Sequence, residues 1–248
     1  MFADTAQAPQ WLLSSWIRSC QAAGATANEP QLVALCRELL DRWNEDDRTY
    51  HGLKHLVDVL SHVDELAEEA TDPDLVRLAA WYHGAVFSAA AKVAYANAAG
   101  EDEVASAALA REQLIAIGVP PERVEKVAGM VTKLVRHKPV KADSDCAVLV
   151  DADLAVLKSD PQRYRQYLKE IREEYAHIPT EDFLRARLKI IARLLERPQL
   201  FSTMASSSWE DAARQNLEGE QARLAKELRR IEAEKPEPLE AGESDQQG

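Results

Sequence analysis

Residues 32–43 read LVALCRELLDRW, and this stretch decides the fold because its apolar residues recur at helical spacing. They fall at i, i+3, i+4, i+7, i+8 and i+11, the positions of Leu32, Leu35, Cys36, Leu39, Leu40 and Trp43. On an α-helix these positions form one continuous stripe that packs against a core. Similar stripes run through residues 124–135, 164–175 and 183–195, and no convincing run of strict alternation is found. We therefore expect an all-α fold.

Proline-containing segments predict where helices begin. Residues 71–74, 119–122 and 159–161 each place a proline where the first turn of a helix tolerates it. The apolar run at residues 146–150 is expected to start a buried helix. Residues 85–100 are rich in alanine and lack a bulky stripe, so we expect part of this segment to be a long, mobile loop.

The domain organisation follows from a change in composition near the C-terminus. Helical patterning continues to about residue 231, which predicts a single helical domain over residues 8–231. From residue 232 to residue 248 the apolar content collapses, and Glu, Asp, Pro, Gln and Gly dominate. Such a composition cannot bury a core, so we expect a disordered acidic tail.

Overall charge and composition exclude some classes of partner. The formal net charge of −12 disfavours nonspecific binding to nucleic acid or to anionic membranes, which require basic surfaces. No apolar stretch reaches the roughly 18 residues that a membrane span needs. The cysteines are odd in number and scattered, which suits a cytoplasmic protein better than a disulfide framework. A small phosphorylated molecule held by a local cation remains compatible with this charge, and a homo-oligomer is left open.

Histidines form the first part of a candidate site. His51 and His55 stand four residues apart, so both imidazoles project from one face of a helix. Imidazole is a common ligand of transition metals, although pairs with this spacing also arise by chance on solvated helices. Arg48, Tyr50 and Lys54 flank the pair with groups that bind phosphate or form hydrogen bonds.

A third histidine and two aspartates lie in apolar sequence. His83 ends a buried-looking segment, where a core histidine with satisfied hydrogen bonds is the simpler interpretation. Asp151 and Asp153 are flanked by apolar residues, and buried carboxylates need a partner or a metal. Two residues apart on a helix, they diverge by roughly 200°. One aspartate is therefore expected to face a site while the other caps or pairs elsewhere.

The order of these motifs resembles the metal-dependent phosphohydrolases of the HD superfamily. The chain carries RTYHGLKH at residues 48–55, WYHGAVFS at 81–88, DADL at 151–154 and IREEYAHIP at 171–179. A bacterial group of that superfamily has RxYHxxxH, WYHDAVYD and DADL in the same order, and the likeness extends from about residue 42 to residue 217. The resemblance implies an HD-like helical bundle.

The resemblance also implies roles for individual residues. The metal ligands would be His55, His83 and Asp153, with Arg48 and Lys54 on phosphate and with His51 or His137 in proton transfer. Gly84 stands where the family has the aspartate of its His-Asp pair. Ser88 stands where the group has a second aspartate. The acidic half of this motif is therefore missing.

The loss of the aspartate shifts the expected chemistry. Two imidazoles and one carboxylate suit Zn²⁺, Mn²⁺ or Fe²⁺ better than Mg²⁺, which prefers hard oxygen ligands. We expect a metal-dependent phosphohydrolase acting on a small phosphomonoester or a nucleotide. The alternatives are a degenerate HD domain that binds a ligand or a protein, and a purely structural helical domain. Restoring the carboxylate with Gly84→Asp is expected to tighten metal binding.

Overall fold

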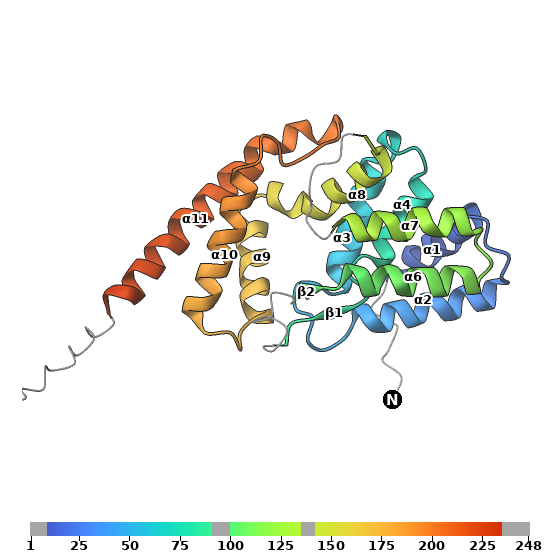
Figure 1. The fold of residues 1–248 in the computed structure, drawn as a ribbon, viewed down its shortest axis with the longest axis horizontal. Helices are drawn as coiled ribbons and strands as arrows, with labels where there is room; N and C mark the ends of the chain where they lie inside the picture. Colours follow the sequence, from blue (N-terminus) through green and yellow to red (C-terminus); the bar gives the residue numbers. More distant parts are fainter. Residues whose placement is uncertain (1–8, 91–99, 135–141, 235–248) are drawn as a thin grey trace, which may run out of the picture.

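The protein, described by a computed structural model, is all-α (Figure 1). The structure describes residues 9–90, 100–134 and 142–234. In chain order the α-helices of these residues are α1 (Gln10–Ala22), α2 (Glu29–Trp43), α3 (Leu53–Glu65), α4 (Pro73–Tyr82), α6 (Glu103–Ala116), α7 (Pro121–Lys133), α8 (Ser144–Leu154), α9 (Pro161–Glu174), α10 (Thr180–Leu195) and α11 (Glu210–Ala233). Short 3₁₀ helices occupy Ala67–Glu69, Ala155–Lys158 and Ala205–Trp209.

The helix starts predicted at the prolines are confirmed. Helices α4, α7 and α9 all begin at a proline. Asp72 caps α4 by accepting a hydrogen bond from the backbone N–H of Leu75, and Asp160 caps α9 through the N–H groups of Gln162 and Arg163. Each such cap contributes about 1 kcal/mol to helix stability. The apolar run at residues 146–150 lies inside α8, as expected.

The core surrounds α4, which packs against α1, α3, α7 and α8. From Leu78 to Tyr82 every residue of α4 is fully buried, so the second half of this helix is apolar on all sides. The apolar stripe of α2 faces the same core. Trp43 at the end of α2 donates from its indole Nε1 to the backbone oxygen of Trp81 at 3.0 Å, which ties α2 to the last turn of α4.

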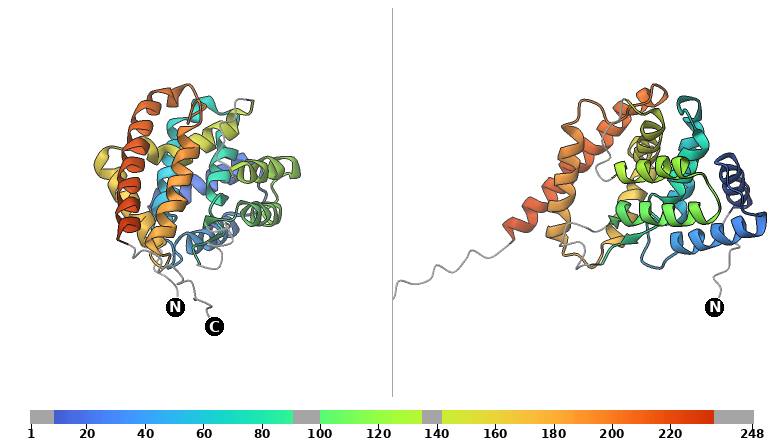
Figure 2. Two further views of the ribbon diagram at one scale, coloured as in Figure 1. Left: turned by 60° about the vertical axis from the view of Figure 1, so that its left-hand side comes forward. Right: turned by 45° about the vertical axis from the view of Figure 1, so that its right-hand side comes forward.

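The C-terminal helices form a second packed group beside this core. Helices α10 and α11 lie side by side in the views of Figures 1 and 2, and the start of α11 packs against the 3₁₀ helix Ala155–Lys158. Buried Glu220 of α11 accepts hydrogen bonds from Tyr164 of α9 at 2.6 Å and from Arg187 of α10 at 2.8 Å. Helix α11 extends to Ala233, two residues past the predicted domain end, and residues 235–248 lie outside the described residues.

A small sheet replaces part of the loop expected between residues 85 and 100. Strand β1 (Phe87–Ser88) pairs antiparallel with β2 (Gly100–Glu101), with Phe87 opposite Glu101. The sequence did not predict it, because two residues are too short to show the alternation of a strand. Residues 91–99 lie outside the described residues. The pairing brings Glu101 beside the segment that follows α4. Among the helices described, none combines the length and apolar character needed to cross a membrane.

Candidate metal centre

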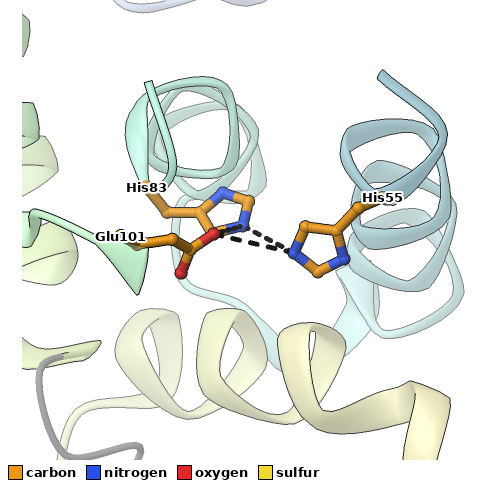
Figure 3. A group of neighbouring side chains, drawn as sticks. All are labelled: His55, His83 and Glu101. Atoms are coloured by element: carbon orange, nitrogen blue, oxygen red, sulfur yellow. Dashed lines mark hydrogen bonds and ion pairs between the residues drawn. The ribbon is translucent and has the colours of Figure 1, made fainter. Parts of the chain in front are cut away.

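Two buried histidines meet between α3 and α4. His55 projects from the buried face of α3, and His83 follows the last residue of α4. Their Nε2 atoms are 3.2 Å apart (Figure 3). His83 Nδ1 lies 2.5 Å from the backbone oxygen of Ala80, which can only accept a hydrogen bond. The neutral ring of His83 therefore carries its proton on Nδ1, and its Nε2 lone pair faces His55.

Two carboxylates complete the cluster from other elements. Asp153 of α8 places Oδ1 3.2 Å from His55 Nε2 and 3.7 Å from His83 Nε2. Glu101 of β2 places Oε1 3.5 Å from His83 Nε2 and 3.8 Å from His55 Nε2 (Figure 3). The group His55, His83 and Glu101 has the mutual spacing of metal ligands. Asp153 Oδ1 lies beside this group, close to both imidazole nitrogens.

The pKa values of the two histidines shift in opposite directions. Burial by itself lowers the pKa of His55, but the hydrogen bond and negative charge of Asp153, with the charge of Glu101, outweigh it and raise that pKa. Burial lowers the pKa of His83, and the charges of Glu101 and Asp153 offset this only in part. These shifts favour the protonated form of His55 and the neutral form of His83.

The spacing of His55, His83 and Glu101 suits ligands of a tetrahedral first-row metal. Metal–nitrogen and metal–oxygen bonds of about 2.0–2.2 Å imply tetrahedral ligand–ligand distances of roughly 3.3–3.6 Å. The donor distances given above, from 3.2 to 3.8 Å, bracket that range. Glu101 Oε1 is buried and has no hydrogen-bond donor in the described part of the chain. A buried carboxylate oxygen without a donor is costly, and a cation between it and the imidazoles removes that cost.

Asp151, two residues before Asp153, has a different role. Its carboxylate accepts hydrogen bonds from the backbone N–H groups of Ser202 and Thr203 and from the hydroxyls of Thr203 and Ser206, at 2.7–2.9 Å. It therefore holds the segment that leads into the 3₁₀ helix Ala205–Trp209. The expected divergence of the two aspartates is confirmed.

His51 lies beside the cluster and is paired with a carboxylate. Its Nδ1 is 2.5 Å from Glu174 Oε2, and its ring centroid is 5.7 Å from that of His55. Glu174 Oε1 accepts the backbone N–H groups of Thr49, Tyr50 and His51 at 3.0–3.1 Å. Burial by itself raises the pKa of Glu174, but the hydrogen bond and charge of His51 and these N–H groups lower it overall. The sequence motif at residues 171–179 contains Glu174 but did not identify this pair.

Arg48 contacts only protein groups among the described residues, whereas the sequence predicted that it would bind phosphate. Its side chain is fully buried, and it donates to Glu45 Oε2 and to the backbone oxygens of His51, Gly84 and Ala85. These contacts use all five of its N–H donors. Arg48 therefore fixes the backbone that follows His83, and it has no donor left for a substrate.

The other expected residues divide between the surface and the undescribed part of the chain. Lys54 is 58% exposed in its side chain and pairs with Glu170 at 3.2 Å. His137 lies outside the described residues. Ser88 lies in β1, so its segment is part of the small sheet rather than the loop expected there.

A polar cavity of about 170 Å³ opens onto His55 and Asp153. Its wall also includes Tyr50, Asp58 and Arg163. Arg163 Nη2 contacts Asp58 Oδ2 at 2.9 Å, and its Nη1 contacts Glu170 Oε2 at 3.2 Å. Sequence reasoning missed Arg163, because a basic residue in the first turn of an amphipathic helix carries no local sign of facing a cavity.

Comparisons with known proteins give no further identification. No family model, no curated protein and no solved structure matches this chain.

Proposed function

We propose that the chain is a metal-dependent phosphohydrolase of the HD type, with its divalent cation held by His55, His83, Asp153 and Glu101. The observation that carries the proposal is the convergence of two imidazoles and two carboxylates, one with an oxygen lacking any described donor. Two imidazoles favour Zn²⁺, Mn²⁺ or Fe²⁺ over Mg²⁺. When bound, such a cation polarises a phosphoryl group and activates water for attack.

The chain's own residues orient the site. The hydrogen bond from His83 Nδ1 to Ala80 oxygen fixes the ring so that Nε2 faces the donor cluster. Glu174 plays the same part for His51: a proton on Nδ1 is shared with the carboxylate, which leaves Nε2 as the basic nitrogen. We therefore assign proton transfer to His51. Its ring centroid lies 5.7 Å from that of His55.

The cavity favours a small phosphomonoester over a whole nucleotide. Its volume is about 170 Å³. Pockets that enclose drug-sized ligands are larger, about 300–1,000 Å³. Arg163 supplies the cation for the phosphate, because it lines the cavity and its planar guanidinium suits phosphate oxygens. The three cysteines are buried and unpaired, which suits the cytoplasmic location that we propose.

Metal analysis combined with an activity screen tests the proposal. We expect the purified protein to bind Zn²⁺, Mn²⁺ or Fe²⁺ and to hydrolyse a small phosphomonoester when loaded. His55→Ala should abolish both properties. His177→Ala is a matched control, because His177 is exposed and outside the cluster. Failure to bind any of these metals, or no turnover across a panel of phosphomonoesters with Zn²⁺, Mn²⁺, Fe²⁺ and Mg²⁺, would overturn the proposal.

A further inference from the structure

Gly84 is surrounded too closely to carry a side chain. A Cβ atom at this position would lie 2.5 Å from Glu101 Oε1 and 2.6 Å from Cη2 of Trp43. Non-bonded carbon atoms prefer separations of about 3.5–4.0 Å. Gly84 is not among the glycines with positive φ, so the backbone conformation does not explain its identity. Space is the reason for glycine here.

The walls around Gly84 are held in place. The ring of Trp43 is buried and anchored by its hydrogen bond to Trp81, and the guanidinium of Arg48 lies 5.3 Å from its centroid. Arg48 also donates to the backbone oxygen of Gly84 at 2.6 Å. Glu101 is fixed from the other side by the pairing of β2 with β1. Neither the ring nor the backbone can retreat cheaply from an added methyl group.

Glu101 fills the place that a side chain at position 84 would enter. Its side chain is 8% exposed, and Oε1 faces both imidazole Nε2 atoms without a hydrogen-bond donor from the described residues (Figure 3). An ionised carboxylate in such a place needs a positive partner. The imidazole Nε2 atoms lie 3.5 and 3.8 Å from Glu101 Oε1, which is too far for good hydrogen bonds. These positions are suitable for sharing a cation with Glu101.

We infer that Glu101 is the anionic metal ligand that compensates for the missing aspartate, and that Gly84 is required because any side chain there displaces Glu101. The carboxylate comes from the strand β2 instead of the residue after His83. This inference rests on the proposed metal site, and it concerns which residues build that site. It also reverses the expectation from sequence: Gly84→Asp should weaken metal binding.

Metal affinity of four variants tests the Glu101 assignment. The variants are Glu101→Gln, Gly84→Ala, their double mutant, and the control Glu112→Gln, which removes an exposed carboxylate from α6. Affinity for Zn²⁺ and Mn²⁺ is measured by competition with a chelator. Glu101→Gln should lower this affinity at least about tenfold, because mutation of a residue around a metal site commonly has an effect of that size. Glu112→Gln should leave it unchanged. Equal affinities for wild type and Glu101→Gln would overturn the assignment.

The double mutant tests the link between the two positions. If Gly84→Ala acts by displacing Glu101, it should weaken binding in the wild type but add little once Glu101→Gln is present. Fully additive losses, or no loss from Gly84→Ala, would overturn the role of Gly84.

Thermal unfolding without metal separates a ligand from a structural residue. Because glutamine has nearly the size of glutamate, metal-free Glu101→Gln should keep a Tm close to that of wild type, while the metal-induced rise in Tm shrinks. A lower metal-free Tm with an unchanged metal-induced rise would overturn the inference. Wild type that binds metal without phosphatase activity would sink the proposed function alone, whereas wild type that binds no metal would sink both.

Discussion

Asp151 and Asp153 are neighbours on one helix, yet they belong to two different kinds of buried polar centre. Asp151 is enclosed by four protein donors from Ser202, Thr203 and Ser206. Asp153 faces two imidazole nitrogens at 3.2 and 3.7 Å, in a group where Glu101 Oε1 has no described donor. The closed centre is satisfied by protein donors alone, whereas the open centre leaves Glu101 Oε1 without a donor among the described residues.

The largest expected effect comes from changing the two aspartates separately. Asp151→Asn places an amide against four donors and should reduce the free energy of unfolding by about 3 kcal/mol, since broken buried charge networks cost that much. Asp153→Asn should cost less, on the order of 1 kcal/mol, because the amide oxygen can still accept a hydrogen bond from the imidazole of His55. Urea denaturation of the metal-free proteins measures both.

The same pair should behave in the opposite way toward metal. Asp151→Asn, where folded, should retain metal binding, and Asp153→Asn should lose it. Saturating Zn²⁺ at about 100 times the dissociation constant stabilises a binding-competent protein by about 2.7 kcal/mol, so added metal should raise the Tm of the first variant only. Equal behaviour of the two variants in both measurements would remove the distinction between the centres.

The sequence predicted the helices and part of the candidate site. Periodic apolar stripes and proline starts depend on local spacing, which is why α2, α4 and α9 follow from sequence. His55, His83 and Asp153 were nominated through ordered motifs, and the structure brings them together. Residue order alone could not establish which atoms meet.

The residues that were missed, or that have another role than the expected one, depend on tertiary contacts. Glu101 reaches the cluster through the pairing of two-residue strands, which leaves no periodic signal. Arg48 is expected at the surface as a cation, and only the carbonyl groups around it explain its burial. Arg163 faces the cavity because of where α9 packs, which its local sequence does not encode.

Glu174 resembles Asp151, because protein donors surround its carboxylate as well. Its pKa in the folded protein is lowered from 4.5, so it stabilises the fold above that pH. This contribution is lost as the pH falls through the lowered folded pKa. Glu174→Gln cannot titrate, so its stability should fall less steeply than that of wild type below pH 4.5. Urea denaturation at a series of acidic pH values provides the measurement, and parallel curves would show that Glu174 makes no such contribution.

Lys54 should give the smallest effect, because its contacts are exposed and replaceable. Its ammonium group pairs with Glu170, which also accepts hydrogen bonds from Arg163 at 3.2 Å and Gln166 at 3.1 Å. Lys54→Ala therefore leaves Glu170 with two donors. Surface pairs of this kind contribute about 0–1 kcal/mol, so we expect the free energy of unfolding to change by at most about 0.5 kcal/mol. Urea denaturation at low and high salt measures it. A decrease in the free energy of unfolding above about 1 kcal/mol would contradict this expectation, because it is larger than an exposed ion pair contributes.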